Sequence, residues 1–258
     1  MNATKRGVIV GMVLGDGYVQ VRKRPRVDGS IYEERNIRVL HGPKQRAYCE
    51  WKATRLSWAL GGQQVNVTKC RNGPGGRYWA YQFSKSHPYF GQIRRWCYPA
   101  GVKTLTRNVL NMLTPEGLAI WYMDDGSARR NVNSKGWVSS VASDIATMCT
   151  RLEAETIVDW FMDEYGIEWK IRYRKASPEN KACYIQTNTA GSKAFAGIIK
   201  PYVPECMLYK LAHVATLMSH ERQTPLGVCV NAECDRPVYE NRRQGLCDTC
   251  YSRWYRKR

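Results

Sequence analysis

The sequence predicts an α+β protein made of two similar halves and a small metal-binding module at its C-terminus. Three observations support this fold class. An apolar run that ends in Asp-Gly occurs twice, at residues 9–17 and 118–126, which indicates an internal repeat. After each run apolar and polar residues alternate, as in strands with one buried face. Four closely spaced cysteines follow. We therefore divide the chain into residues 1–105, 106–224 and 225–258.

The first half is expected to begin with a helix over residues 5–14, which Thr4 can cap. Gly7 and Gly11 are four residues apart and therefore share one face of this helix. Glycine lowers helix propensity, so two of them suggest that another backbone packs closely there. The matching helix of the second copy is the expected partner. If the two helices cross near their C-terminal ends, Asp16 and Asp125 emerge side by side.

The remaining elements follow the same plan in both halves. In the first half, the alternation of apolar and polar residues predicts strands at 18–22, 31–41, 65–70 and 78–83. Helices are expected at 43–60 and 88–96, and a link to the second half at 100–106. In the second half the expected elements are a strand at 137–143, a helix at 147–165, strands at 168–174 and 182–187, and a helix at 192–202. Each half is thus expected to read helix, two strands, helix, two strands, helix.

The charge balance indicates a polyanionic partner. The 258 residues include 40 Lys and Arg against 22 Asp and Glu, a net charge of +18. Nucleic acid is the expected partner. An anionic membrane surface is the weaker alternative, because no basic amphipathic helix or lipidation signal accompanies the charge. No secretory signal or long apolar run is present, so we expect an intracellular protein with reduced cysteines, in the cytoplasm of a bacterial or phage-infected cell or in an organelle.

Asp16 and Asp125 end the two repeated runs. A helix C-terminus already carries partial negative charge, so an acid there is unfavourable unless a positive charge lies beside it. Two carboxylates at close quarters would also repel each other unless a hard divalent cation such as Mg²⁺ neutralises them. For one run alone, a helix stop followed by a turn would explain the pattern. The repeat favours a shared metal site.

The repeat resembles the LAGLIDADG homing endonucleases, in particular the single-chain branch with two motifs. The similarity covers roughly residues 5–215. It is carried by residues 121–127 (WYMDDGS), 48–52, 86–88, 103, 113–115, 200–202 and 209–211. The resemblance implies two pseudo-symmetric αββαββα halves that form one saddle-shaped antiparallel sheet surface on double-stranded DNA. A chain that carries both halves is expected to act as a monomer.

The resemblance also implies a chemistry, which is metal-dependent phosphodiester hydrolysis that breaks both DNA strands at the junction of the halves. The two motif acids would bind Mg²⁺ or Mn²⁺, and the residue before each acid would contribute a backbone oxygen. Two lysines match basic residues that the family places near the metals, although the proline that often follows the first lysine is missing here. The expected catalytic and metal-binding residues are Gly15, Asp16, Lys103, Asp124, Asp125 and Lys210.

Polar and basic side chains on one face of the expected strands, in the loops between them and in the C-terminal tail are the candidate DNA contacts. Guanidinium and amide groups can bind phosphates and base edges. The candidates are Tyr18, Gln20, Arg22, Arg24, Arg38, Arg71, Arg77, Gln82, Lys170, Arg172, Arg174, Gln186, Arg253 and Arg256. A solvated outer face is the alternative interpretation of the same pattern.

The C-terminal segment contains two cysteine pairs. Four residues separate Cys229 from Cys234, twelve residues follow, and two residues separate Cys247 from Cys250. This spacing suits a tetrahedral structural Zn²⁺ site, and so short a segment has too small a core to fold without a metal. Two disulfides are the alternative, which a reducing compartment disfavours.

Two other functions fit the same fold and basic surface. One is an RNA maturase that binds intron RNA and assists splicing, and the other is a DNA-binding regulator that does not cleave. The paired acids Asp16 and Asp125 argue against the regulator, because a pure binder needs no acids beside phosphates. Maturase activity in addition to cleavage stays open.

Overall fold

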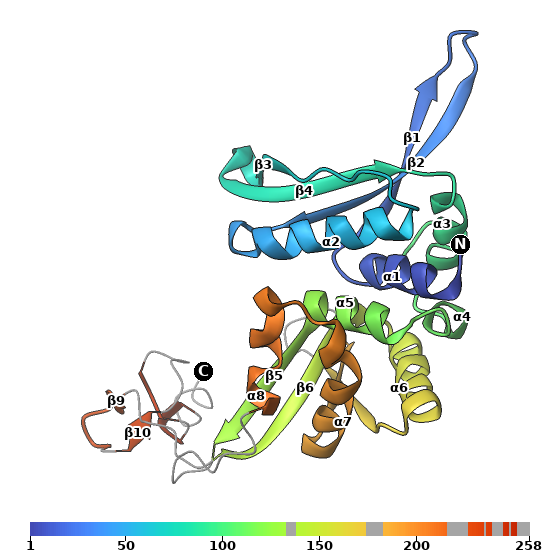
Figure 1. Cartoon of the computed structure of the whole chain (residues 1–258). Helices are drawn as coiled ribbons and strands as arrows, with labels where there is room; N and C mark the ends of the chain where they lie inside the picture. Colours follow the sequence, from blue (N-terminus) through green and yellow to red (C-terminus); the bar gives the residue numbers. More distant parts are fainter. Residues whose placement is uncertain are drawn as a thin grey trace.

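A computed structural model describes residues 1–132, 138–173, 183–215, 227–234, 236–238, 245–247 and 249–251. The first half contains α1 (Ala3–Leu14), β1 (Tyr18–Pro25), β2 (Ile31–His41), α2 (Arg46–Ala59), β3 (Thr68–Asn72), β4 (Tyr78–Ser86) and α3 (Phe90–Cys97). After the short α4 (Arg107–Leu110), the second half contains α5 (Pro115–Asp125), β5 (Gly126–Val132), β6 (Val138–Cys149), α6 (Arg151–Tyr165), β7 (Trp169–Tyr173), β8 (Cys183–Thr187) and α7 (Thr189–Ile199). The predicted order of elements is found in both halves (Figure 1). Three expected DNA contacts, Arg174, Arg253 and Arg256, lie outside the described residues.

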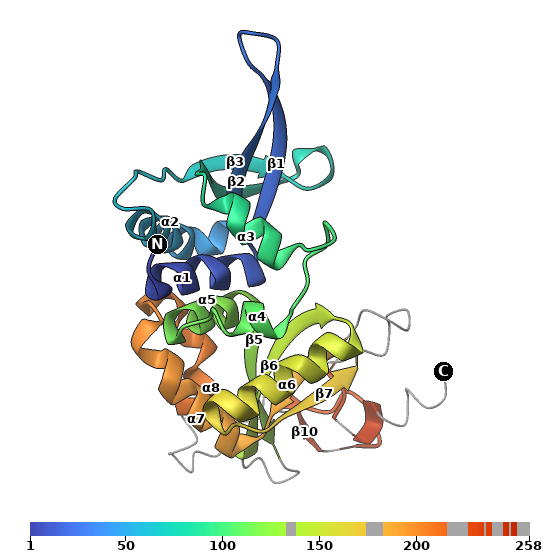
Figure 2. The same ribbon diagram turned by 90° about the vertical axis from the view of Figure 1, so that its right-hand side faces the viewer.

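Each half carries one four-stranded antiparallel sheet. The strand orders are β1-β2-β4-β3 and β5-β6-β8-β7, so equivalent strands occupy equivalent places. In the first half β1 and β2 extend beyond the other strands as a long hairpin, which projects from the body of the molecule (Figures 1 and 2). After α7 come 3₁₀ turns at Lys200–Tyr202 and Glu205–Lys210, and then α8 (Ala212–Ala215). In the C-terminal segment β9 (Gly227–Val228) pairs with β10 (Pro237–Val238).

The helices expected to begin at residues 5, 147 and 192 begin elsewhere, and capping explains these three shifts. The first helix begins at Ala3 rather than at residue 5, because the Asn2 side chain, not that of Thr4, accepts a hydrogen bond from the Lys5 N–H at 3.0 Å. The helix expected at 147–165 begins at Arg151. Thr150 and Glu153 form a reciprocal capping box there, and the preceding strand runs on to Cys149. The helix expected at 192–202 begins at Thr189, because the Asn188 side chain accepts a hydrogen bond from the Gly191 N–H at 2.9 Å.

Helices α1 and α5 pack against each other at the junction of the halves (Figure 1). A Cβ atom on Gly11 would overlap the backbone of Gly117, and one on Gly117 would overlap the carbonyl group of Gly7. The expected close approach of two backbones is therefore confirmed. The two helices are buried along nearly their whole length, and their side chains belong to a single core that extends into both halves.

The strand register gives each sheet one polar face and one face toward the helices. In the first sheet Tyr18 pairs with Arg38, and Gln20 pairs with Asn36. The residues between them, such as Val19 and its partner Ile37, are buried. Because side chains alternate along a strand, the polar residues share the face away from the helices.

Candidate functional site

The two motif acids lie at the C-terminal ends of the paired helices. Asp125 is the last residue of α5, and Asp16 follows α1 with 43% of its side chain exposed. Burial, reinforced by the charges of Asp124 and Asp16, raises the pKa of Asp125 to about 7. Burial and the Asp124 charge also raise the pKa of Asp16. The Asp16 charge thus acts on Asp125 across the junction, and the Lys103 charge, which lowers the pKa of both acids, only partly offsets their burial.

Two lysines lie beside the acids and bind the backbone of the two motifs. The Lys103 ammonium donates to the carbonyl oxygens of Val13, Leu14 and Gly15 at 3.0, 3.1 and 3.0 Å, and so caps the end of α1. The Lys210 ammonium donates to the Gly126 carbonyl oxygen at 2.6 Å.

Burial lowers the pKa of both lysines, Lys103 and Lys210, and the charges of the nearby acids oppose that shift. The structure therefore brings Asp16, Asp125 and both lysines to one place. This corresponds to the arrangement expected from the sequence.

Asp124 occupies a different environment from its neighbour Asp125. Its carboxylate and the Lys52 side chain are both fully buried and form an ion pair of 2.7 Å. The Tyr48 hydroxyl donates to Asp124 Oδ1 at 2.9 Å, and the backbone N–H of Asp16 donates to Asp124 Oδ2 at 3.0 Å. Both carboxylate oxygens are therefore occupied by protein donors.

His41, which the sequence pattern did not single out, lies next to the acids. Its side chain is 1% exposed, and its Nδ1 is 3.5 Å from Asp16 Oδ2. Neither ring nitrogen makes a hydrogen bond of good geometry in the described part of the chain, although Gln45 lies near. Burial and the Lys52 charge lower the pKa of His41 to about 4, so the imidazole is neutral. The only sequence signal is a histidine at the end of the second expected strand.

These groups fit a hard divalent cation. Asp16, His41 and Asp124 can each offer a ligand atom within 4.8 Å of the others. Because the oxygens of Asp124 are occupied by Lys52, Tyr48 and the Asp16 N–H, its side chain is less suited to bind a cation than that of Asp16, which is 43% exposed. A buried imidazole without a good hydrogen bond in the described residues, 3.5 Å from the Asp16 carboxylate whose pKa is raised, is the observation that favours a cation here.

Most candidate DNA contacts lie on the polar faces of the two sheets. In the first sheet Arg38 donates two hydrogen bonds to Gln82, at 3.0 and 2.6 Å, and Arg22 donates to Gln20 at 3.1 Å. The register places Tyr18 and Arg24 on the same face.

The polar face of the second sheet carries an analogous hydrogen-bonded row. Arg172 donates to Gln186 at 3.2 Å, Gln186 donates to Asp144 at 2.7 Å, and Arg129 pairs with Asp144 at 3.2 Å. Lys170 pairs with Gln186 in the register and shares this face. Arg129 and Asp144 were not among the expected contacts.

Two arginines near the β3–β4 turn differ in their placement. Arg71 pairs with Trp79, which lies on the same face as the buried Phe83, and its guanidinium stacks on the Trp79 ring at 3.8 Å from the ring centroid. It therefore lies on the face toward the helices and not in the expected loop, because β3 continues to Asn72. Arg77 is exposed beside the turn at Pro74–Gly76.

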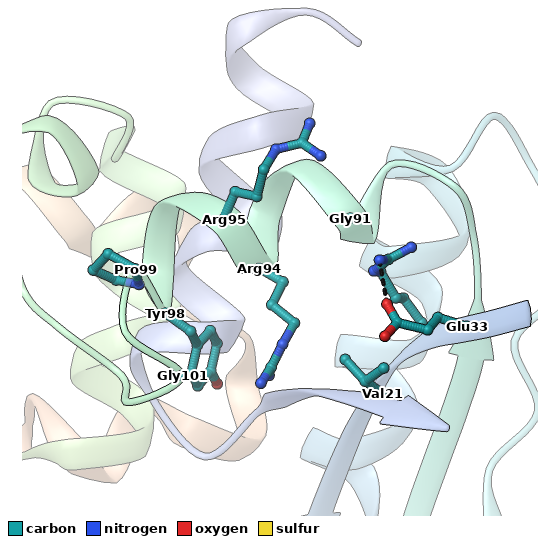
Figure 3. Close-up of a pocket in the computed structure, with 9 residues that line it drawn as sticks. Val21, Glu33, Gly91, Arg94, Arg95, Tyr98, Pro99 and Gly101 are labelled. Carbon is teal, nitrogen blue, oxygen red and sulfur yellow. Dashed lines mark hydrogen bonds and ion pairs between the residues drawn. The ribbon is translucent and has the colours of Figure 1, made fainter. Parts of the chain in front are cut away.

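A concave region of about 670 Å³ lies between α3 and the β1–β2 hairpin (Figure 3). Two of its three arginines are engaged by the protein itself. Arg94 donates to the Val19 carbonyl oxygen at 2.8 Å, and Arg35 donates to Glu33 at 2.6 Å. None of the acids and lysines described above lines this hollow.

The four C-terminal cysteines converge. Their sulfur atoms lie within 4.8 Å of one another, and all ten cysteines of the chain are free thiols. The Cys234 and Cys247 sulfurs are 3.8 Å apart, which matches the edge of about 3.8 Å in a tetrahedron with zinc–sulfur bonds of ~2.3 Å. A hydrogen bond from the Cys247 N–H is the main cause that lowers the pKa of Cys229 to about 7.

Comparison with known proteins identifies the family. A relative, the protein RecA of Mycobacterium gastri, is 30% identical over 218 residues, which are 79% of this chain and 46% of that protein. The chain thus spans about half the length of the curated relatives of this kind. The DNA endonuclease I-ChuI of Chlamydomonas applanata is 25% identical over 230 residues, which cover 81% of this chain and 94% of that protein.

Solved structures share the fold. The homing endonuclease I-WcaI bound to its DNA recognition sequence has a TM-score of 0.63 at 19% identity, over 81% of this chain and 86% of that one. The meganuclease I-SmaMI bound to uncleavable DNA has a TM-score of 0.52 at 12% identity, over 83% and 90%. The predicted α+β fold is confirmed. In the described part of the chain, no helix has the length and apolarity that crossing a membrane requires. The model of the LAGLIDADG DNA endonuclease family matches residues 6–195, and the chain therefore belongs to that family.

Proposed function

We propose that the protein is a site-specific homing endonuclease that makes a double-strand break in DNA by metal-dependent phosphodiester hydrolysis. The observation that carries this proposal is the meeting of Asp16 and Asp125 at the ends of two paired helices, one from each half, with Lys103 and Lys210 beside them. The two halves, residues 1–105 and 106–224, each contribute one acid. A single chain therefore suffices, and we infer a monomer.

The acids hold Mg²⁺ or Mn²⁺ in this proposal. Burial, and after it the Asp124 charge, raises the pKa of both acids, so negative charge is unfavourable at this place and a cation would relieve that cost. A bound divalent cation would supply Lewis-acid activation of water and stabilise the departing 3′ oxygen. Lys103 and Lys210 add positive charge beside the acids and fix the backbone of both motifs through the carbonyl oxygens that they bind.

The polar faces of the two sheets bind the DNA. Guanidinium and amide groups there are joined in pairs, such as Arg38 with Gln82 and Arg172 with Gln186. Pairing restricts the rotamers of long side chains, so less entropy is lost when they contact base edges. The net charge of +18 supplies affinity for the phosphate backbone.

The four C-terminal cysteines bind a structural Zn²⁺ ion. The described residues of the segment from residue 225 onward form one small buried cluster, made largely of these cysteines, so the metal would supply most of its folding free energy. Metal analysis of the purified protein should find one zinc per chain, and replacing Cys229 and Cys247 with serine should remove it. Protein with all four cysteines intact and no zinc would contradict this assignment.

Cleavage of a DNA duplex selected from a randomised library by binding tests the main proposal. Plasmid that carries the selected site should be linearised with Mg²⁺ and left intact with EDTA, while a plasmid without the site stays intact. Binding of the selected duplex without any cleavage in Mg²⁺ or Mn²⁺ would overturn the nuclease assignment.

A further inference from the structure

The position directly before the motif acid carries a carboxylate in only one of the two copies of the repeat. In the second motif Asp124 precedes the acid Asp125, whereas in the first motif Gly15 precedes Asp16. A Cβ atom on Gly15 would overlap the Asp124 carboxylate. Gly15 therefore leaves the space that the side chain of Asp124, the residue at the equivalent position of the second motif, occupies. This explains why the two motifs differ at this position.

The Asp124 carboxylate is held entirely by the first half, although Asp124 belongs to the second. Lys52 and Tyr48 reach it from α2, and the backbone N–H of Asp16 reaches it from the end of α1. A buried charge is costly unless it is paired and its remaining lone pairs accept hydrogen bonds, and here both conditions are met. Of the three donors, only the Asp16 N–H belongs to a residue whose own side chain is exposed at the proposed metal site.

We propose that Asp124, neutralised by Lys52 and hydrogen-bonded by Tyr48, is a positioning residue that fixes Asp16 for metal binding. The inference rests on the proposed nuclease function. The bond between Asp124 Oδ2 and the Asp16 N–H fixes the backbone from which the Asp16 carboxylate projects. Groups that orient a metal ligand in this way typically change metal affinity or activity by about 10- to 100-fold when they are removed.

The alternative is a pair that only joins the two halves, and the chain offers a matched control for that role. Arg55 and Glu116 form a second ion pair between α2 and α5, with bonds of 2.5 and 2.9 Å, and no recorded bond links either residue to Asp16. Removing both charges of that pair should change the stability of the junction without changing the metal site.

Two double variants distinguish the effect of the hydrogen-bond acceptor at residue 124 from the effect of the Lys52–Asp124 charges. Lys52→Met with Asp124→Asn removes both charges and keeps an oxygen that can accept from the Asp16 N–H. Lys52→Met with Asp124→Leu removes the charges and the acceptor. We expect the Leu variant to bind Mn²⁺ and to cleave about 10- to 100-fold less well than wild type, with DNA affinity in EDTA within about twofold. The Asn variant and the control Arg55→Met with Glu116→Gln should stay within about threefold.

Hydrogen exchange at the Asp16 amide supplies a readout that does not depend on cleavage. The amide should be protected in wild type and in the Asn variant, and should exchange at least about tenfold faster in the Leu variant. Equal metal affinity and equal exchange in the Asn and Leu variants would overturn the positioning role. If wild type cuts no DNA, the proposed function fails, and the exchange rates still decide whether Asp124 holds Asp16.

Discussion

The two halves share a fold but support their acids by different means. The register pairs Tyr18 with Arg38 and Ser127 with Asp144. Three residues further along, His41 and Thr147 correspond by position in the chain, although the pairing of β6 with β8 is irregular between Ile145 and Cys149. His41 lies unpartnered beside Asp16, whereas Thr147 donates to the Cys183 carbonyl oxygen at 3.0 Å. The backbone of Asp16 is bound by Asp124, and Gly15 leaves Asp125 no equivalent partner. Pseudo-symmetry therefore extends to the backbone and the acids, but not to the groups around them.

Replacing either acid should have the largest effect. Asp16→Asn and Asp125→Asn should each lower double-strand cleavage by at least about 100-fold, since removing even a group that only orients a ligand costs up to about that much. Plasmid linearisation with Mg²⁺ measures the effect, and DNA affinity should be kept. Asp163→Asn, at an exposed acid that pairs with Arg107, serves as the control. Loss of DNA binding in the acid variants would mean that the acids are structural.

The unequal partners of the acids give the next prediction. His41→Gln should weaken Mn²⁺ binding by about tenfold, because the buried imidazole lies 3.5 Å from Asp16 Oδ2 and makes no good hydrogen bond within the described residues. Thr147→Val at the equivalent position should leave Mn²⁺ affinity unchanged, since Thr147 already bonds to Cys183. Calorimetric titration of each variant with Mn²⁺ measures the two affinities. Equal effects at the two positions would show that the metal site is more symmetric than the side chains suggest.

Acid titration should produce the smallest effect, a change of about ten degrees in melting temperature. Burial raises the pKa of Asp125 from 3.8 to about 7, so the folded state binds this proton more tightly than the unfolded chain does. Stability of the metal-free protein should therefore fall as the pH rises from about 4 to about 7. Asp125→Asn should remove more of this slope than Asp16→Asn, and added Mg²⁺ should flatten it in wild type. Thermal melts in EDTA across this range provide the measurement. If the melting temperature of wild type rose with pH relative to that of Asp125→Asn, the prediction would be wrong.

The sequence predicts the backbone plan and the acids because both depend on local pattern. An apolar run that ends in Asp-Gly, followed by alternation, is visible in a single stretch, and its recurrence links Asp16 to Asp125. The start of α6 was also readable, because Thr150 and Glu153 have capping-box spacing, but the apolar periodicity was extended past it.

The supporting contacts were not readable because they join distant parts of the chain. The bond from the Asp16 N–H to Asp124 spans 108 residues, and the pair of Lys52 with Asp124 spans 72. Such contacts depend on how two helices cross, which no periodicity encodes. The face of Arg71 depends on the strand register, and one residue of slip in the turn would reverse it.

The fit of Gly15 against Asp124 limits how such a chain can be rearranged. Two copies of the first half would place two glycines at the junction and leave the buried Lys52 ammonium without a counter-charge. Two copies of the second half would bring two carboxylates into a space that holds one. A dimer of two first halves or of two second halves would therefore be less stable, because each would contain an unpaired buried charge. The halves have thus become specific for each other, and an exchange of one half with a relative must carry the matching residue on the opposite side of the junction.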